Sequence, residues 1–216
     1  MSKSLFSESD LKRIETAVTA AEKKTSGEIV PYFVEASDSY VDAFWKLLGF
    51  TLIFSLLLTA FIFEYSGWWF PVGIFEILTA ITGGSILLCF LLVKIDPVLR
   101  FAAGRKSIQD RITSRAAEAF VSEEVFATRD RTGILIFISS LEHRVLVIGD
   151  SGINAKVKPE VWTEVANLVV NGIKSGKAAD GIILAIEKCG EILETAGVAI
   201  KSDDTNEIGN ELRVGK

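Results

Sequence analysis

Two long stretches without a charged residue lie in the middle of the chain and constrain its fold more than any other feature. The first runs from Leu47 to Phe63 and the second from Ile77 to Val93. With its flanking aromatic residues, each approaches the roughly 20 apolar residues that a helix needs to cross the hydrocarbon core of a bilayer. Two such helices in tandem would be unusual in a soluble core. The sequence therefore predicts a transmembrane helical hairpin over residues 44–94.

Basic residues flank the predicted hairpin at one end only. They are Lys46 before the first stretch and Lys94, Arg100, Arg105 and Lys106 after the second. The connecting segment 64–70 contains no Lys or Arg, and its aromatic residues Tyr65, Trp68, Trp69 and Phe70 suit an outer interfacial belt. The positive-inside rule then places both termini and the remaining chain in the cytoplasm. We expect a multi-pass protein of the cell (inner) membrane whose first partner is the lipid bilayer.

Glu76 is the exception inside the second apolar region, where an ionised carboxylate is unfavourable. Its side chain either reaches the nearer interface or faces a partner, or it is a functional intramembrane acid. The sequence leaves its role open.

Outside the hairpin, three segments predict the strands of one small sheet. Residues 28–35 are apolar on both faces, but Pro31 cannot donate a ladder hydrogen bond, which favours an edge or distorted strand. Residues 134–139 are almost continuously apolar, as in a central strand. Residues 143–148 follow after a short turn, so these two strands should form an antiparallel hairpin.

Helical periodicity surrounds these strands. Helices are predicted between Ser7 and Gly27, over 98–127 as one long amphipathic helix, from Pro159 to Ser175, and over 178–196. The tail 201–216 has little to bury and is expected to be disordered. Residues 1–43 and 95–200 should thus form one discontinuous domain of the α/β (α+β-like) class. Its small mixed sheet of three to four strands is flanked by helices, and the transmembrane hairpin is inserted in it.

Composition excludes several function classes. The net charge is −5 and no basic patch is interleaved with aromatic residues, so nucleic-acid binding has no electrostatic basis. Cys89 lies in the second apolar stretch and Cys189 on an apolar helix face, without metal-ligand spacing. Neither a phosphate-binding glycine loop nor a serine nucleophile motif occurs.

Loop residues at the ends of the predicted strands provide the candidate site. Because strands 134–139 and 143–148 are antiparallel, Asp130 and Asp150 should lie at the same end of their hairpin. Together with Thr132 and Ser151, the two carboxylates could bind calcium or another divalent cation, and Arg129 joins them in a candidate ligand site. The competing interpretation, which we favour, is that Arg129 and Arg131 pair with Asp130 and only order the loop.

Two further carboxylates and the sole histidine lie near the other strand ends. Glu28 precedes the first strand, and Glu142 and His143 form the turn of the hairpin. A His–carboxylate pair could serve as a base or metal ligand. An exposed turn histidine is the favoured interpretation.

Several short motifs resemble the TPM-domain family, named for a thylakoid lumen protein, a photosystem II-associated protein and a modulator of acetylcholine receptors. They are KTSGEIV at 24–30, TGILIF at 132–137, EHRV at 142–145, GDSGI at 149–153 and ADGI at 179–182. The resemblance covers residues 5–43 and about 100–198. It implies a small mixed sheet flanked by helices. Some members of the family bind calcium, some show acid phosphatase activity, and others are accessory factors of membrane complexes.

The leading hypothesis is an accessory, assembly or scaffold partner of other membrane proteins. The sequence leans away from an enzyme but leaves enzymatic activity open. The alternative is a divalent-metal-dependent, phosphatase-like hydrolase that uses Asp130 and Asp150. A third possibility is self-association through the hairpin into a homo-oligomer.

Overall fold

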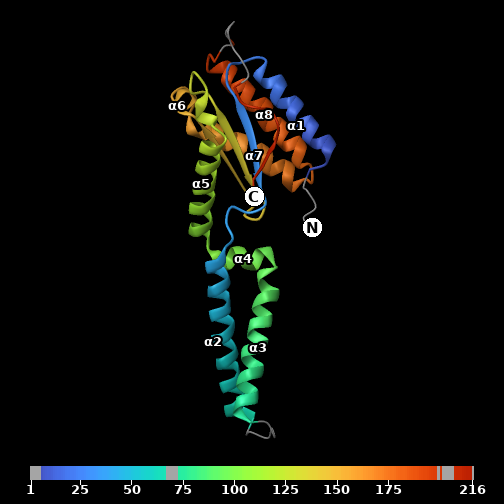
Figure 1. Ribbon diagram of the computed structural model, residues 1–216, viewed down its shortest axis with the longest axis vertical. Coiled ribbons are helices and arrows are strands. Elements are labelled where there is room, and N and C mark those ends of the chain that lie inside the picture. The colour runs from blue at the N-terminus through green and yellow to red at the C-terminus, as the bar shows by residue number, and fades with distance from the viewer. Residues whose placement is uncertain (1–5, 67–72, 199, 201–206, 216) are drawn as a thin grey trace. The chain divides into compact units, whose positions relative to one another are not determined.

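The chain divides into two compact units in its computed structural model, which describes residues 6–66, 73–198, 200 and 207–215 (Figure 1). We call one unit, Met1–Ser37 with Arg111–Lys216, the α/β unit, and the other, Asp38–Asp110, the helical unit. The sequence predicted the boundaries near residues 43 and 95. The helical unit is longer than the predicted hairpin because it also contains the helix that follows the second apolar stretch.

A four-stranded mixed sheet forms the centre of the α/β unit, in the order β3-β2-β1-β4. The strands are β1 (Ile29–Val34), β2 (Ile134–Ser139), β3 (Arg144–Gly149) and β4 (Arg213–Gly215). β1 pairs with β2 and with β4 in parallel, whereas β2 and β3 form the predicted antiparallel hairpin. Every residue of β1 and β2 is buried. This agrees with their nearly continuous apolar sequence, which is typical of strands covered on both faces.

The prediction that Pro31 marks an edge strand is wrong, since β1 lies between β2 and β4. The carbonyls of Glu28 and Val34 accept hydrogen bonds from the β2 side, so the nitrogen of Pro31 points toward the β4 side. β4 pairs with β1 only from Tyr32 onward. The missing donor of Pro31 therefore lies just before that pairing starts, where no ladder bond is lost.

The predicted disorder of the tail 201–216 is wrong for residues 207–215. β4 adds to the sheet there, and Ile208 and Leu212 are buried. Arg213 fastens the strand through an ion pair of 3.0 Å between its Nε and Oε2 of Glu123. Two apolar residues in a polar tail give too weak a pattern to predict a strand.

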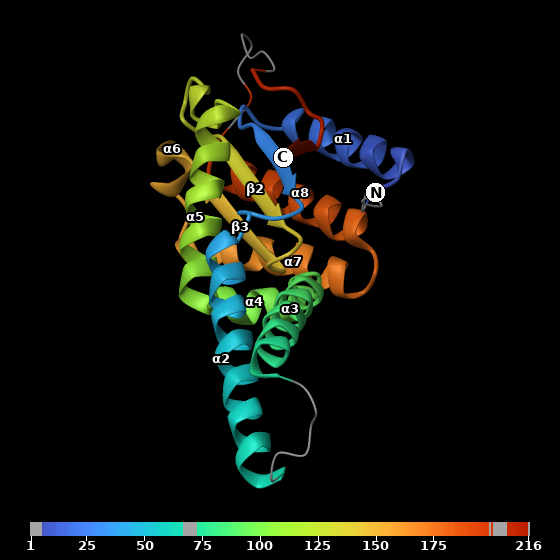
Figure 2. The same cartoon turned by 60° about the horizontal axis from the view of Figure 1, so that its bottom comes forward.

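Helices cover both faces of the sheet. One face carries α1 (Glu8–Glu22), α7 (Pro159–Lys174) and α8 (Ala178–Thr195), and Figure 2 shows α5 (Arg105–Ser122), from Arg111 onward, on the other face. The core joins alternate strand residues to the three helices, including Phe33, Ile136, Ile138, Ile14, Val18, Val165, Ile182 and Leu193. Gly172 and Gly181 let α7 and α8 approach closely, because a Cβ at Gly172 would lie 2.5 Å from Gly181 Cα.

The predicted single helix over 98–127 is interrupted twice. α4 (Asp96–Ala103) ends at Gly104, whose φ of +81° is left-handed and separates it from α5. After α5, Glu124 has a φ of +53° and a 3-10 turn follows at Val125–Ala127. The apolar residues that recur every four positions begin at Ile108, after Gly104, so this pattern did not support a helix that extends back across the glycine.

Two long apolar helices, α2 (Val41–Ser66) and α3 (Ile74–Val93), pack against each other in the helical unit. Hydroxyl groups lie between them, with Ser55 Oγ 2.7 Å from Ser85 Oγ and Thr51 and Cys89 also buried. The spans Val41–Tyr65 and Glu76–Val93 each have a mean hydropathy of 2.1 and are long and apolar enough to cross a membrane. Only 6% and 11% of their most apolar windows are buried.

Glu76 lies in the first turn of α3, with its carboxylate against Gly73 at the helix start. This is nearer the end of the helix than the sequence suggested, and a carboxylate there is favoured by the helix dipole. Trp68, Trp69 and Phe70, which were expected to form an interfacial belt, lie outside the described residues.

Candidate functional site

Asp150 and Arg131 form a two-pronged ion pair across one end of the β2–β3 hairpin. Asp150 follows β3 and begins the short helix α6 (Ser151–Asn154), where its Oδ1 accepts the backbone N–H of Ser151 at 2.6 Å. Arg131 precedes β2, and its Nη2 lies 3.0 Å from Oδ1 and its Nε 2.7 Å from Oδ2 of Asp150. The Asp150 side chain is 4% exposed. Arg131 thus supplies the charge that a buried carboxylate needs.

Backbone contacts close the same two loops against each other. The N–H of Asp150 donates to the carbonyl of Gly133, and that of Gly152 donates to the carbonyl of Arg131, both at 2.9 Å. A Cβ at Gly152 would collide with the carbonyl oxygen of Asp130, which explains the glycine. The Arg131 guanidinium also lies 5.8 Å from the centre of the Phe126 ring. The arrangement orders the loops and leaves Asp150 directed at Arg131.

As predicted, Asp130 and Asp150 lie at the same end of the hairpin, in the two loops that the ion pair joins, and Ser151 follows Asp150. Thr132 is buried and donates its hydroxyl to the carbonyl of Ser26 at 3.3 Å. Arg129 and Asp130 are exposed, and the Arg129 backbone N–H donates to Glu207 Oε2 at 3.3 Å. The sequence favoured pairing of Arg131 with Asp130, whereas in the structure Arg131 forms an ion pair with Asp150 in the opposite loop.

The donor set at Asp130 and Asp150 does not fit a divalent cation. Calcium takes six to eight oxygen ligands, whereas the buried carboxylate here already carries a guanidinium. Among the residues that the structure describes, no group of three or more His, Cys, Asp or Glu side chains is arranged to hold a metal ion. We therefore derive no metal chemistry from this loop.

At the other end of the hairpin, Glu142 is buried and ties the turn to the segment after β1. Its Oε1 accepts the backbone N–H of Ser37 at 2.7 Å, and its Oε2 accepts the hydroxyl of Ser139. His143 is exposed with a φ of +53° in the turn. This is the expected turn histidine, and Glu142 binds serine groups as a structural element.

A second carboxyl pair, Glu22 with Glu28, was not predicted as a pair. Glu22 Oε1 accepts the N–H of Ile29 at 2.9 Å, and Glu28 Oε1 accepts the N–H of Glu207 at 3.1 Å. Burial raises the pKa of Glu22 to about 8. The negative charge of Glu28 and a hydrogen bond with Glu28 contribute to the same shift. Burial beside Glu28 therefore favours the protonated form of Glu22 at neutral pH. The pair joins the end of α1 to the start of β1, and no spacing rule identifies it.

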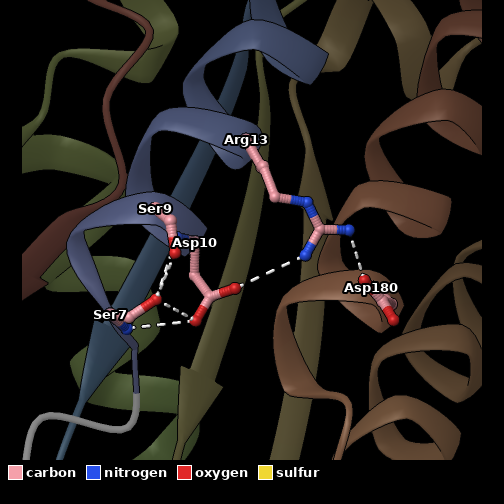
Figure 3. Close-up of polar contacts among 5 residues, drawn as sticks. All are labelled: Ser7, Ser9, Asp10, Arg13 and Asp180. Carbon is pink, nitrogen blue, oxygen red and sulfur yellow. Dashed lines mark hydrogen bonds and ion pairs between the residues drawn. The ribbon is translucent and has the colours of Figure 1, made fainter.

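Figure 3 shows a polar cluster that fastens α1 to α8. Ser7 caps α1 by a capping box with Asp10, whose pKa is held below its usual value by these hydrogen bonds. Arg13 reaches Asp10 Oδ1 at 3.4 Å and Asp180 Oδ1 at 2.5 Å. All these groups are on the surface, beside a groove of about 280 Å³. Asp180, part of the motif at 179–182, thus has a structural contact, and the Ser7 hydroxyl and the Asp10 carboxylate are both used in capping α1.

Cys189 is excluded as a nucleophile by its burial. Its side chain is 0% exposed in the core, and burial raises the pKa of the thiol to about 12. Because the thiolate is the reactive form, this residue is inert at neutral pH. The sequence prediction of a core position is confirmed.

Comparison with known proteins identifies the fold alone. No protein-family model and no protein of curated function matches the sequence. Among solved structures, the chain is similar to the NMR structure of BA42, a protein of the psychrophilic bacterium Bizionia argentinensis. The two have a TM-score of 0.61 and 19% sequence identity over 100% of this chain and 99% of BA42. The two proteins thus share an overall fold, which in this chain is a mixed α/β arrangement of one four-stranded sheet flanked by helices.

Proposed function

We propose that this protein is an integral membrane protein whose helical unit anchors the α/β unit, and that it acts as an accessory, assembly or scaffold partner of other membrane proteins. The observation that supports the membrane anchor is that α2 and α3 expose their large apolar side chains and bury small polar ones between them. Large apolar side chains such as Leu57 and Leu87 are 65% and 63% exposed, while the Ser85 hydroxyl side is buried. In water such a surface would be unfavourable by about 25 cal/mol for each Å² of apolar area.

The hydrogen-bonding pattern supports the same proposal. Thr51, Ser55 and Thr59 each donate to a carbonyl of their own helix, and Ser55 also contacts Ser85 of the neighbouring helix. Bilayer helices use small polar residues in this way, because no water is available to their backbones.

The accessory role rests on the chemistry of the α/β unit. Asp150 is ion-paired with Arg131, Glu142 binds serine groups, and Cys189 is buried, so these groups serve structure. The motif resemblance supports a TPM-like domain, in a family with accessory members. Nothing in the described residues favours the metal-dependent hydrolase, and we do not propose it.

Orientation is tested by labelling single cysteines in intact cells with a membrane-impermeant maleimide. Tyr65→Cys, at a position 77% exposed at the end of the first span, should react at once. Lys158→Cys, exposed in the α/β unit, should react only after lysis. The buried native Cys89 and Cys189 keep the background low. Equal labelling of both variants in intact cells would contradict the proposed topology.

The accessory role is tested by affinity purification from native membranes in mild detergent, followed by mass spectrometry. We expect a membrane protein recovered near stoichiometric amounts with the tagged full chain. A tagged chain carrying Ile136→Asn, which disrupts the sheet core, is the control and should retain the anchor but lose the partner. Recovery of the chain alone in the wild type would contradict the accessory role and leave the anchor intact.

A further inference from the structure

We propose that a groove between α2, α3 and α4 binds one acyl chain of an anionic phospholipid. The inference rests on the proposed membrane anchor and deepens it by assigning a specific ligand to one end of the hairpin. The groove measures about 550 Å³ and belongs entirely to the helical unit. It is lined by Lys46, Leu47, Phe50, Thr51 and Phe54 of α2, Leu88 and Leu92 of α3, and Val98, Phe101 and Ala102 of α4.

The walls of the groove are apolar and partly rigid. Phe50 and Phe54 stack with their ring centres 6.3 Å apart and their planes 13° from parallel. Phe101 of α4, which is 89% exposed, contributes to the lining from a different helix. Thr51 offers no free donor, because its hydroxyl already bonds the carbonyl of Leu48 at 3.0 Å. An occupant therefore meets hydrocarbon along the groove.

The charge lies at one end. Among the described residues that line the groove, Lys46 is the charged one, and its Nζ lies 3.1 Å from Oδ2 of Asp42. Lys46 is 58% exposed, so it remains able to contact a headgroup phosphate. A basic residue near the membrane surface contributes about 1 kcal/mol toward anionic lipid.

The length of the groove fits this ligand. From Lys46 to Phe54 the α2 helix rises by about 12 Å at 1.5 Å per residue. This spans from the headgroup level well into one leaflet, whose hydrocarbon is roughly 15 Å deep. A phospholipid has the same gradient, with an anionic head and an apolar tail. A protein segment in the groove would instead have to satisfy its backbone groups without water.

The test is native mass spectrometry of the full chain in detergent, with palmitoyl-oleoyl phosphatidylglycerol or phosphatidylcholine added. The wild type should retain one phosphatidylglycerol. Ala102→Trp, which fills the groove, should weaken binding of both lipids by about tenfold or more. Lys46→Gln should reduce the preference for phosphatidylglycerol by about fivefold. Ala60→Trp, the same substitution at an exposed α2 position outside the groove, should bind like the wild type.

Three results would overturn the lipid site: no retained lipid in the wild type, equal retention by Ala102→Trp, or a dimer that Ala102→Trp abolishes, which would assign the groove to a second copy. Alkaline carbonate extraction of the membranes separates this failure from that of the anchor. Release of the wild-type chain into the supernatant would contradict the proposed function. If the wild-type chain stays in the pellet and Ala102→Trp binds lipid like the wild type, the lipid site in the groove is contradicted and the membrane anchor is not.

Discussion

The two units of this protein distribute the same residue types in opposite ways. In the α/β unit Ile136 is fully buried and charged residues cover the surface, whereas in the helical unit Leu57 is 65% exposed and Ser85 is 2% exposed. Hydrophobic residues lie on the inside only when the surrounding solvent is water. The difference fits the lipid surroundings that we propose for the helical unit, and it teaches that burial must be judged separately in each unit.

The strongest test of the comparison is Ile136→Asn in the centre of β2. The substitution removes buried hydrocarbon and adds an amide without a partner, so we expect a loss of about 4–6 kcal/mol in the stability of the α/β unit. Circular dichroism of the full chain in detergent should show the sheet unfolded while the helices α2 and α3 remain. Leu184→Asn, at a position of α8 that is 50% exposed, is the control and should unfold like the wild type.

A charge at Leu57 tests whether its surroundings are lipid. Leu57→Asp should raise the apparent free energy of insertion of α2 by about 3–4 kcal/mol, because an aspartate at the centre of a membrane helix is unfavourable. The measurement is the inserted fraction of α2 in a translocon insertion assay. Leu184→Asp, at an exposed leucine of the α/β unit, should change neither stability nor insertion by a comparable amount. Normal insertion of the Leu57 variant would remove the contrast between the units.

Leu212→Ala sharpens the comparison at the edge of the sheet. Leu212 is 7% exposed beside β4, and its truncation should cost about 2–4 kcal/mol of stability in the α/β unit. Hydrogen exchange in β1 from Tyr32 to Val34 should accelerate, since these residues pair with β4. Val214→Ala, 64% exposed in the same strand, should have little effect. Equal effects of the two variants would contradict the burial of this segment.

Stability of the α/β unit should fall with rising pH because of Glu22. Its folded-state pKa of about 8 lies above its ordinary value of 4.5, so the folded chain holds the proton more tightly. This contribution is complete below pH 4.5 and is lost as the pH rises toward 8. Between pH 6 and pH 8.5 the loss should be about 2–3 kcal/mol, visible as a lower melting temperature in detergent. Glu22→Gln should flatten the profile, whereas Glu15→Gln, at an exposed position, should leave it unchanged.

The smallest effect is expected where α2 and α3 contact each other. Ser85→Ala removes the contact with Ser55 and should weaken α2–α3 packing by about 0.6 kcal/mol, a typical value in membranes. Labelling of the buried Cys89 by a maleimide in detergent, quantified on its own peptide, should accelerate about threefold. Thr82→Ala is the control, because the Thr82 hydroxyl donates to the carbonyl of Leu78 in its own helix at 2.8 Å. If Thr82→Ala accelerates the labelling of Cys89 more than Ser85→Ala does, the Ser55–Ser85 contact does not hold the two helices together.

Much of the fold follows from local pattern. The β2–β3 hairpin, the core position of Cys189 and the two apolar helices were predictable, because each depends on periodicity or on length within one segment. The position of β1 was not, since Pro31 argued for an edge. Whether a proline is tolerated depends on where the neighbouring strand begins, and β4 lies at the far end of the chain.

The candidate site was predictable in part. Antiparallel pairing placed Asp130 and Asp150 at one end of the hairpin, as the loop contacts of Gly152 with Asp130 show. The partner of Asp150 was not predictable, because Arg131 contacts it from the opposite loop and not from its sequence neighbours. The Glu22–Glu28 pair was missed for a similar reason. The pKa of Glu22 is raised by burial and by Glu28, and Glu28 in turn accepts the N–H of Glu207 from a distant part of the chain, which no local pattern reveals.

The parallel pairing of β1 with β2 has a consequence for biosynthesis. β1 leaves the ribosome early, but its partner follows only after about a hundred further residues that contain both apolar helices. At 5–20 residues per second, the first strand waits roughly 5–20 s with its backbone groups unpaired and its apolar side chains exposed. Chaperone binding to nascent residues 29–34 is therefore expected to persist until β2 has left the ribosome. Under the proposed membrane anchoring, slow insertion of α2 and α3 would lengthen that exposure and lower the yield of correctly paired sheet.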